Sequence, residues 1–406
     1  MHLVALTHLF YPAQGGTEIS LRQLAEGLVK KGHRVTVVTS KQVSLEAFKY
    51  PRIDLSLKAE EVRAGIRILR LPLTPNQRFI LAKTGALALR SRLPGGDRLW
   101  FMTQVPHLPQ MIKTARELKP DIIYAVPFPT ASIYYASVAA KKIGCPWVIQ
   151  PHLHVKDVNN SLIKILRWIF PKASALLTNT RAEKEYLEKQ GIQEEKIHVV
   201  GQGIDLALLD GGDGRRFRSA HGLTHEPLLL FLGRKVENKG IDTLLETMPL
   251  VWKEEPSAVL VLAGQSSPYF LTLLNNHPLS KDPRIISIDN FPEEEKADLL
   301  MACDLLILPS LAESFGVVFL EAWAKGKPVI GARIPAVEDM IIDGEDGFLV
   351  PYGDPVSLAA AAQQLIKDPD LRRNMGENGK LKVVHRFEIS RVTDHMEALF
   401  LSLVKR

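Results

Sequence analysis

Short apolar runs alternate along the chain with longer segments whose apolar residues recur at helical spacing. The runs have the length of buried strands, and the segments between them have the length of helices. In the first half of the chain the expected strands are residues 3–9, 34–40, 66–71, 121–126, 146–151, 174–179 and 197–200. In the second half they are residues 228–233, 259–263, 285–288, 305–308 and 328–331. This alternation predicts an α/β fold of doubly wound parallel sheets with helices on both faces.

The length of 406 residues exceeds the size at which a single core stops growing, so two domains are expected. A segment rich in glycine and charge, residues 201–216, is typical of a domain junction. We therefore expect a domain at 1–200, a second at 201–385, and a last helix, 386–406, that packs back on the first domain. Two doubly wound domains would face each other across a cleft at the carboxyl ends of their strands, where ligands of such folds bind.

The chain carries no pattern of export or membrane insertion. Its first residues run directly into a strand without the basic and apolar regions of a signal peptide. Residues 122–140 carry no charge, but Pro127 and Pro129 divide them into an expected strand and a helix. Cys145 and Cys303 lie in apolar contexts that indicate no disulfide, so a cytoplasmic location is expected.

The most informative segment is residues 309–322, which follows an expected strand. Glu313 lies in the loop, Gly316 opens a helix, and Glu321 lies on that helix. A helix start favours phosphate through its unpaired N–H groups and its dipole, and carboxylates accept hydrogen bonds from hydroxyl groups. The segment predicts a site for a sugar joined to phosphate. The alternative interpretation is two solvated charges on a helix.

Two glycine-containing loops follow the first strands of the two halves. The loop at residues 233–240 carries Arg234 and Lys239, a guanidinium fork and a point charge that suit a diphosphate. Gly15 and Gly16 open the first helix, where paired glycines let a ligand approach the backbone. The alternatives are a solvated charged turn and a plain tight turn. The absence of G-x-G-x-x-G spacing at the first loop disfavours a nicotinamide or flavin site.

Two histidines follow the strand expected at 146–151. An extended chain would place His152 and His154 on one face, where they suit metal binding, acid–base chemistry or hydrogen bonds to a sugar. A metal site needs a third ligand, which no sequence neighbour supplies. Asp368 and Asp370 lie between two helical patterns and are expected to form a turn and a helix cap instead of a metal site.

Together these segments resemble the retaining glycosyltransferases of family 4, also called glycosyl transferases group 1, which have the GT-B fold of two Rossmann-like domains. The resemblance covers nearly the whole chain, from residues 10–16 through the basic loop and both glutamates to residues 343–350. Its most specific part is residues 309–321.

The resemblance implies a role for each side chain. Arg234 and Lys239 would bind the nucleotide diphosphate, Glu313 would hold hydroxyl groups of the donor sugar, Glu321 would hold the ribose, and His152 would lie near the sugar. Cations and a helix start can stabilise the leaving diphosphate without a metal ion, so no cofactor is expected. Retention would follow the front-face route proposed for this family, with neither glutamate as nucleophile.

The resemblance also implies contacts through the backbone. The backbone of Phe315, Gly316 and Val317 would contact sugar and phosphate. Gly15 and Gly16 would lie near the diphosphate and the acceptor. The expected activity is transfer of a hexose from a nucleotide-diphosphate sugar to a hydroxyl acceptor, a lipid-linked or polysaccharide glycan of the cell envelope. The alternatives are a nucleotide-sugar epimerase of related architecture and a non-catalytic sugar-binding protein of two domains.

Three departures from the family pattern leave the donor open. Residues 264–268 replace the usual Gly-x-Gly-Pro, residues 334–336 replace a glycine pair, and Gln202 stands where asparagine is usual. The fold is expected to survive these changes.

The basic residues concentrate in the first half. Residues 1–200 hold 29 Lys and Arg against 15 Asp and Glu, a net +14, whereas residues 201–406 hold 22 against 30, a net −8. No nucleic-acid-binding motif is present, so nucleic acid is not expected. Cations mixed with apolar residues at 78–119 and 164–170 suit an anionic membrane surface, which predicts peripheral association with the cytoplasmic face. The alternative is that these apolar residues are core and the charges a solvated rim.

Overall fold

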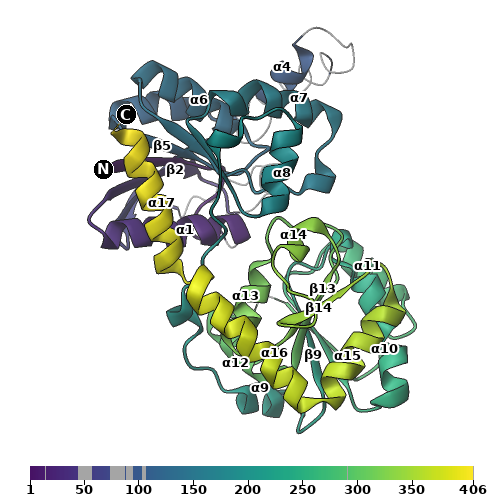
Figure 1. The fold of residues 1–406 in the computed structure, drawn as a ribbon. Coiled ribbons are helices and arrows are strands. Elements are labelled where there is room, and N and C mark those ends of the chain that lie inside the picture. The colour runs from purple at the N-terminus through teal and green to yellow at the C-terminus, as the bar shows by residue number, and fades with distance from the viewer. Residues whose placement is uncertain are drawn as a thin grey trace. The chain divides into compact units, whose positions relative to one another are not determined.

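The computed structural model describes residues 1–13, 15–43, 57–73, 87, 95–102, 107–289 and 291–405. The chain divides into an N-terminal unit, Met1–Gly203 with Ile389–Arg406, and a C-terminal unit, Ile204–Glu388. The boundaries expected from the sequence were residues 200 and 385. The last helix therefore belongs to the same unit as the first strand (Figure 1).

The described sheet of the N-terminal unit has the strand order β3-β4-β2-β1-β5-β6-β7-β8. Its strands are β1 (His2–Leu6), β2 (Arg34–Ser40), β3 (Glu60–Arg63), β4 (Ile66–Leu71), β5 (Ile122–Ala125), β6 (Trp147–Ile149), β7 (Ala175–Thr178) and β8 (Ile197–Val199). Neighbouring strands are parallel except for β3 and β4. The strands expected in this half are confirmed, although the first ends at Leu6 and not at residue 9. The edge strand β3 was missed because its sequence, Glu-Glu-Val-Arg, is mostly charged and lacks a buried face.

Helices cover both faces of this sheet. They are α1 (Gly16–Lys30), α4 (Gly96–Met102), α5 (Gln110–Leu118), α6 (Ala131–Ile143), α7 (Asn160–Ile169), α8 (Arg181–Lys189) and α17 (Ile389–Val404). Side chains of β1 alternate between two cores because successive residues of a strand point to opposite faces. Val4 and Leu6 belong to the core that includes α4 to α7, whereas Leu3 and Ala5 belong to the core that includes α1 and α17.

The helix α17 closes the N-terminal unit by packing beside α1 (Figure 1). A Cβ on Gly27 would lie 2.7 Å from Oγ1 of Thr393, so the glycine permits the close approach of the two helices. The Lys31 ammonium lies 2.8 Å from the Glu397 carboxylate, and Phe400 is fully buried in the core. Residues from the two ends of the chain thus complete one core.

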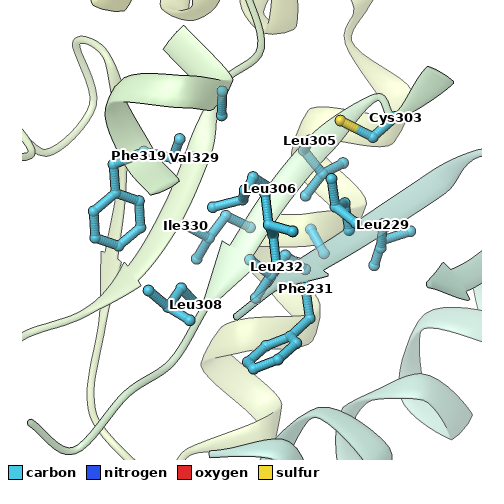
Figure 2. Close-up of a cluster of buried hydrophobic side chains, with 14 of the residues drawn as sticks. Leu229, Phe231, Leu232, Cys303, Leu305, Leu306, Leu308, Phe319, Val329 and Ile330 are labelled. Atoms are coloured by element: carbon cyan, nitrogen blue, oxygen red, sulfur yellow. The ribbon is translucent and has the colours of Figure 1, made fainter. Parts of the chain in front are cut away.

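The described sheet of the C-terminal unit is entirely parallel and has the order β11-β10-β9-β12-β13-β14. Its strands are β9 (Leu228–Leu232), β10 (Val259–Ala263), β11 (Ile285–Ile288), β12 (Leu305–Leu308), β13 (Val329–Ala332) and β14 (Gly347–Val350). The central strands β9 and β12 have the sequences Leu-Leu-Leu-Phe-Leu and Leu-Leu-Ile-Leu, which are apolar throughout because both faces of each strand are buried. Figure 2 shows part of this core, with Leu229 of β9 beside Leu305 of β12, its partner in the strand register.

The C-terminal unit has helices α9 (Gly214–Ala220), α10 (Ile241–Glu254), α11 (Pro268–Asn276), α12 (Glu293–Ala302), α13 (Val317–Ala324), α14 (Pro335–Glu338), α15 (Pro355–Lys367) and α16 (Pro369–Lys382). Short helical turns of the N-terminal unit are η1 (Val155–Asp157), η2 (Phe170–Lys172) and η3 (Glu194–Lys196), and those of the C-terminal unit are η4 (Leu206–Leu209), η5 (Glu237–Lys239) and the π-helical η6 (Val383–Phe387). Asp368 caps α16 by accepting from the N–H groups of Asp370 and Leu371, which confirms the expected turn and cap.

The strand order of the C-terminal unit contains a topological switch point. From β9 the chain adds β10 and β11 on one side and then β12, β13 and β14 on the other. The order therefore reverses between β9 and β12. In open α/β sheets ligands bind outside the carboxyl ends of the strands at such a switch point.

The uncharged stretch 122–140 contains β5 and most of α6, as the proline positions predict. Within the described part of the chain, every helix is too short or too polar to cross a bilayer.

Candidate active site

The loops that follow β9 and β12 pack against each other at the switch point. The N–H of Leu311 donates to the carbonyl of Asn238 at 2.9 Å. Gly240 has a φ of +69°, and a Cβ there would lie 2.3 Å from the carbonyl oxygen of Pro309. Only glycine fits this conformation and this space, so the two loops approach backbone to backbone.

This packing brings two of the predicted donor-site residues into direct contact. The Lys239 Nζ lies 2.5 Å from Oε1 of Glu313, and their side chains are 13% and 8% exposed. Arg234, in the same loop as Lys239, is exposed and forms no ion pair with any residue that the structure describes. The sequence assigned the lysine to phosphate and the glutamate to sugar, but it did not predict that each is the partner of the other.

The helix α13 begins beside this ion pair. Its N-cap is Gly316, which has a φ of +90° and provides no side-chain cap. A Cβ on Gly316 would lie 2.7 Å from the ring of Phe319. The ring of Phe315 is buried edge to face against Phe387 at 5.7 Å, so this residue offers its backbone to a ligand. The start of α13 at Val317 thus presents N–H groups that can bind an anion.

The second glutamate of the segment is also paired. Glu321 lies on α13, and its Oε1 is 3.0 Å from Nζ of Lys296 on α12. Both side chains are mostly buried, at 12% and 11% exposure. The sequence did not single out Lys296, because only the packing of α12 beside α13 brings these residues together.

A further lysine, also missed, is fully buried at the carboxyl end of β9. The Lys235 Nζ donates to Oγ of Ser287 at 2.8 Å and lies 2.9 Å from the Asp289 carboxylate. Burial lowers the pKa of Lys235, and Asp289 counteracts that shift. Ser266 donates to Asp289 at 2.8 Å, and Ser267 caps α11. The serines that replace the usual Gly-x-Gly-Pro therefore make specific hydrogen bonds in this chain.

In the N-terminal unit, His152 lies after β6 but not on an extended chain. Its φ is +54°, and His154 leads directly into η1. The prediction that these two histidines share one strand face is therefore wrong. The left-handed conformation of His152 interrupts the extended backbone, and the His152 side chain is buried.

A chain of buried polar groups determines the tautomer of His152. The Tyr124 hydroxyl donates to Oε1 of Gln150, whose Nε2 donates to Oδ1 of Asn179 at 2.8 Å. The Asn179 amide then donates to Nδ1 of His152 at 3.1 Å, and Nε2 of Gln202 lies 3.4 Å from the same atom. The nitrogen Nδ1 is therefore an acceptor, and the proton resides on Nε2. Burial lowers the pKa of His152 to about 3, so the ring is neutral.

The loop that carries His152 is held by a carboxylate that the sequence did not single out. Glu183 accepts from the N–H of Leu153 at 2.9 Å and from the N–H of Asn179 at 2.7 Å. Burial raises the pKa of Glu183 to about 7. The Thr180 N-cap followed by Glu183 matches the Ser/Thr-x-x-Glu pattern of a helix start. That pattern predicts the start of α8, but it contains no information about Leu153.

The two predicted glycines at the start of α1 differ in their surroundings. A Cβ on Gly15 would lie 2.2 Å from Oε2 of Glu18, whereas one on Gly16 would have no atom within 4 Å. The other carboxylate oxygen of Glu18 lies 3.7 Å from Nε2 of His8, and burial lowers the pKa of His8 to about 4. Gly15 thus gives room to a buried Glu18 beside the helix start. Gln14 lies outside the described residues.

The structure buries several apolar residues of the segments that the sequence suggested for a membrane surface. The apolar residues Phe101, Met111, Ile165, Leu166, Ile169 and Phe170 are buried in the core between the sheet and α4 to α7. Trp168 is only partly buried, with the cations of Arg98 and Lys172 at 5.0 and 4.5 Å from its ring. The cations at Arg78, Lys83, Arg90 and Arg92 and the apolar run at 79–81 lie outside the described residues.

Within the described ranges, no three His, Cys, Asp or Glu side chains are grouped to hold a metal ion. The candidate side chains are instead lysines, an arginine, carboxylates and a neutral histidine. Such a set can bind anions and hydroxyl groups.

The fold defines the class of protein. A solved structure of Anabaena HepE in complex with UDP and glucose matches with a TM-score of 0.78, covering 99% of this chain and 100% of that chain at 19% identity. The protein thus has the predicted GT-B fold. The models of Glycosyltransferase Family 4 and of Glycosyl transferases group 1 match residues 14–208 and 214–382. The chain belongs to glycosyltransferase family 4, as its motifs indicated, and it is a glycosyltransferase.

The names of similar proteins indicate different acceptors. N-acetyl-alpha-D-glucosaminyl L-malate synthase of Bacillus anthracis is 24% identical over 403 residues, 97% of this chain and 96% of that protein. D-inositol 3-phosphate glycosyltransferase of Corynebacterium kroppenstedtii is 32% identical over 250 residues, 59% of this chain and 55% of that protein. The names differ in the acceptor, so membership in the family leaves the acceptor open.

The environment of His152 predicts that it does not titrate near neutral pH. Its folded pKa of about 3 means that protonation requires acid well below the range in which imidazole ordinarily titrates. In histidine-selective nitrogen NMR spectra, we expect Nε2 protonated and Nδ1 unprotonated throughout about pH 5 to 8. Exposed histidines in the same sample provide the reference. Titration of the His152 signals within this range would contradict the prediction.

Proposed function

We propose that this glycosyltransferase moves a hexose from a nucleoside-diphosphate hexose to a hydroxyl acceptor, with retention at the anomeric carbon and without a metal ion. The observation that carries the proposal is the Lys239–Glu313 pair beside the start of α13 at the switch point. It puts a cation, a carboxylate and helix N–H groups within one site. A sugar diphosphate requires this combination, because its phosphates need positive charge and its hydroxyl groups need an acceptor.

Donor binding exchanges the partners of this ion pair. Phosphate oxygens take the place of Glu313 at the Lys239 ammonium, and sugar hydroxyl groups donate to the released carboxylate. The pair thus keeps both charges compensated until the donor arrives. Glu321, two turns along α13, is the corresponding acceptor for the ribose hydroxyls, and its partner is Lys296.

The transfer step needs charge stabilisation at the leaving group. The acceptor oxygen bonds to the anomeric carbon while the bond from that carbon to the β-phosphate oxygen breaks, and the acceptor proton passes to the departing diphosphate. Arg234, Lys239 and the start of α13 stabilise the negative charge that grows on this group. The Nε2–H of neutral His152 donates a hydrogen bond to a sugar oxygen. Glu313 orients the sugar and does not attack it, because its released carboxylate is occupied by hydrogen bonds from the sugar hydroxyl groups.

The relatives support a nucleotide sugar as donor. The Anabaena HepE structure holds UDP and glucose, and a second structure of that protein holds UDP-glucose. We take the acceptor to be a hydroxyl group of a lipid-linked or polymeric glycan, which is consistent with the basic N-terminal half of the chain.

We expect a nucleoside diphosphate or nucleotide sugar to raise the melting temperature. A ligand that binds only the folded state stabilises it by about 2.7 kcal/mol at a concentration of 100 times Kd. A thermal-shift panel of UDP, GDP, ADP and dTDP with their glucose conjugates measures this directly. The free sugars and inorganic phosphate are the controls. A panel in which no nucleotide shifts the transition would contradict the donor site.

We expect Glu313→Gln and Lys239→Ala each to lower kcat by about 100-fold or more, since each removes one charge from the transition-state site. The circular dichroism spectrum should stay close to that of the parent protein, and the melting temperature should fall, because each substitution leaves one mostly buried charge without its partner. Glu246→Gln and Lys253→Ala, at exposed positions of α10, are the matched controls. The assay separates glycoside product from free epimerised sugar nucleotide. Full activity in both site variants would refute these roles, and epimer without glycoside would refute transfer.

We also propose that the α4–α7 side of the N-terminal unit contacts an anionic membrane surface. Arg98 and Lys172 flank the ring of Trp168, which stacks on Tyr134 at 5.7 Å. Burial lowers the pKa of Lys172, and the charges of Arg98 and Lys141 lower it further, which indicates a cluster of like charges. Aromatic rings among cations suit the headgroup layer of an anionic bilayer.

The membrane proposal predicts pelleting with anionic vesicles at low salt and release at high salt, since screening weakens the attraction. Lys141→Glu with Lys172→Glu should weaken binding to phosphatidylglycerol vesicles about 30-fold, taking about 1 kcal/mol for each cation lost. Lys30→Glu with Lys405→Glu, on the α1 and α17 side, is the control with the same change in charge. Absence of binding, or equal loss in both double variants, would overturn this proposal.

A further inference from the structure

Glu183 joins two segments of the N-terminal unit that are separate in sequence. Its Oε1 accepts from the N–H of Leu153, in the loop after β6, at 2.9 Å. Its Oε2 accepts from the N–H of Asn179, after β7, at 2.7 Å. Leu153 directly follows His152, and the Asn179 side chain donates to Nδ1 of His152. One carboxylate therefore holds both the backbone and the hydrogen-bond partner of the histidine.

We propose that Glu183 is a positioning residue for His152, and that it fixes the backbone and the tautomer with which the Nε2–H of this histidine meets the donor sugar. This inference rests on the proposed function only for the role of His152 in transfer. The positioning itself follows from the contacts of Glu183, Leu153 and Asn179.

The backbone of His152 needs such a restraint. A φ of +54° is unfavourable for a residue with a side chain and persists only where the surroundings hold it. The Leu153 N–H immediately follows this residue, so its bond to Glu183 restrains the left-handed conformation. If that bond is lost, the imidazole can move away from the amide of Asn179.

Capping of α8 does not account for this arrangement. Thr180 caps the helix by accepting from the N–H of Glu183 at 3.1 Å. In a capping box the glutamate reaches back to the N–H of the cap residue itself. Glu183 instead reaches Asn179 and the separate loop at Leu153, and no ion pair links it to a cation in the described part of the chain. A buried carboxylate is costly, so its use here indicates a requirement for two acceptor oxygens.

The test is Glu183→Gln, which keeps the shape of the side chain but replaces one acceptor oxygen with an NH2 group. One of the two backbone N–H groups then faces a donor. We expect kcat to fall by about 10- to 100-fold with little change in donor affinity, because the histidine is displaced and the phosphate site is not. Glu185→Gln, at an exposed position of the same helix, is the matched control and should keep the parent kcat.

Two further measurements separate positioning from a general loss of structure. In nitrogen NMR spectra of Glu183→Gln, the His152 signals should move toward the average of the two neutral tautomers, without any substrate present. In a His152→Ala background, Glu183→Gln should cause no further loss of kcat, since residues that act through one group are not additive.

Unchanged His152 signals, or the same fold loss of kcat with and without His152, would overturn the inference. The NMR result does not depend on the reaction. If the parent protein transfers no sugar but the tautomer still changes, the proposed function fails while the positioning role stands. If transfer is observed and the tautomer does not change, the positioning role alone is refuted.

Discussion

The candidate donor site depends on one close contact, the approach of Gly240 to the carbonyl of Pro309 at the switch point between β9 and β12. A side chain at Gly240 would push these loops apart, because its Cβ would overlap that oxygen and its φ is positive. The contact, together with the hydrogen bond from Leu311 to Asn238, holds Lys239 beside Glu313. The charges of the site are thus arranged by backbone packing and not by the ion pair alone.

The C-terminal unit pairs the buried lysines near its candidate site with carboxylates. Lys239 with Glu313, Lys296 with Glu321, and Lys235 with Asp289 each join a lysine to a carboxylate near the carboxyl ends of the strands. Unpaired charges in such poorly solvated places would be costly. A ligand that carries both phosphate and hydroxyl groups can take over both partners of a pair, whereas a ligand with only one of these groups leaves a charge uncompensated. Pairing therefore favours the whole donor over its fragments.

The candidate side chain of the N-terminal unit differs from these ion pairs, because His152 is neutral. Along the chain from Tyr124 through two side-chain amides to His152, each group donates a hydrogen bond to the next. The last bond ends on Nδ1 of His152, so Nε2 carries the proton and is the donor. A neutral donor can bind a sugar oxygen without competing with the cations for phosphate. The strands that carry these groups were predictable from their apolar runs, but the left-handed turn at His152 was not, since nothing in its local sequence requires a positive φ.

The sequence by itself determined the two doubly wound sheets, the family and the positions of the helix starts. Apolar periodicity and glycine placement are local properties, and strands, helices and turns form in direct response to them. The capping pattern at Thr180 and Glu183 was likewise readable as a helix start. Only the tertiary structure decided which charges pair, how His152 is held, and that the apolar residues of α7 are core. Those outcomes depend on contacts between residues 25 to 74 positions apart, as in Lys296–Glu321 and Lys239–Glu313. Which distant segments meet is set by strand order and helix packing, and one-dimensional spacing does not encode that order.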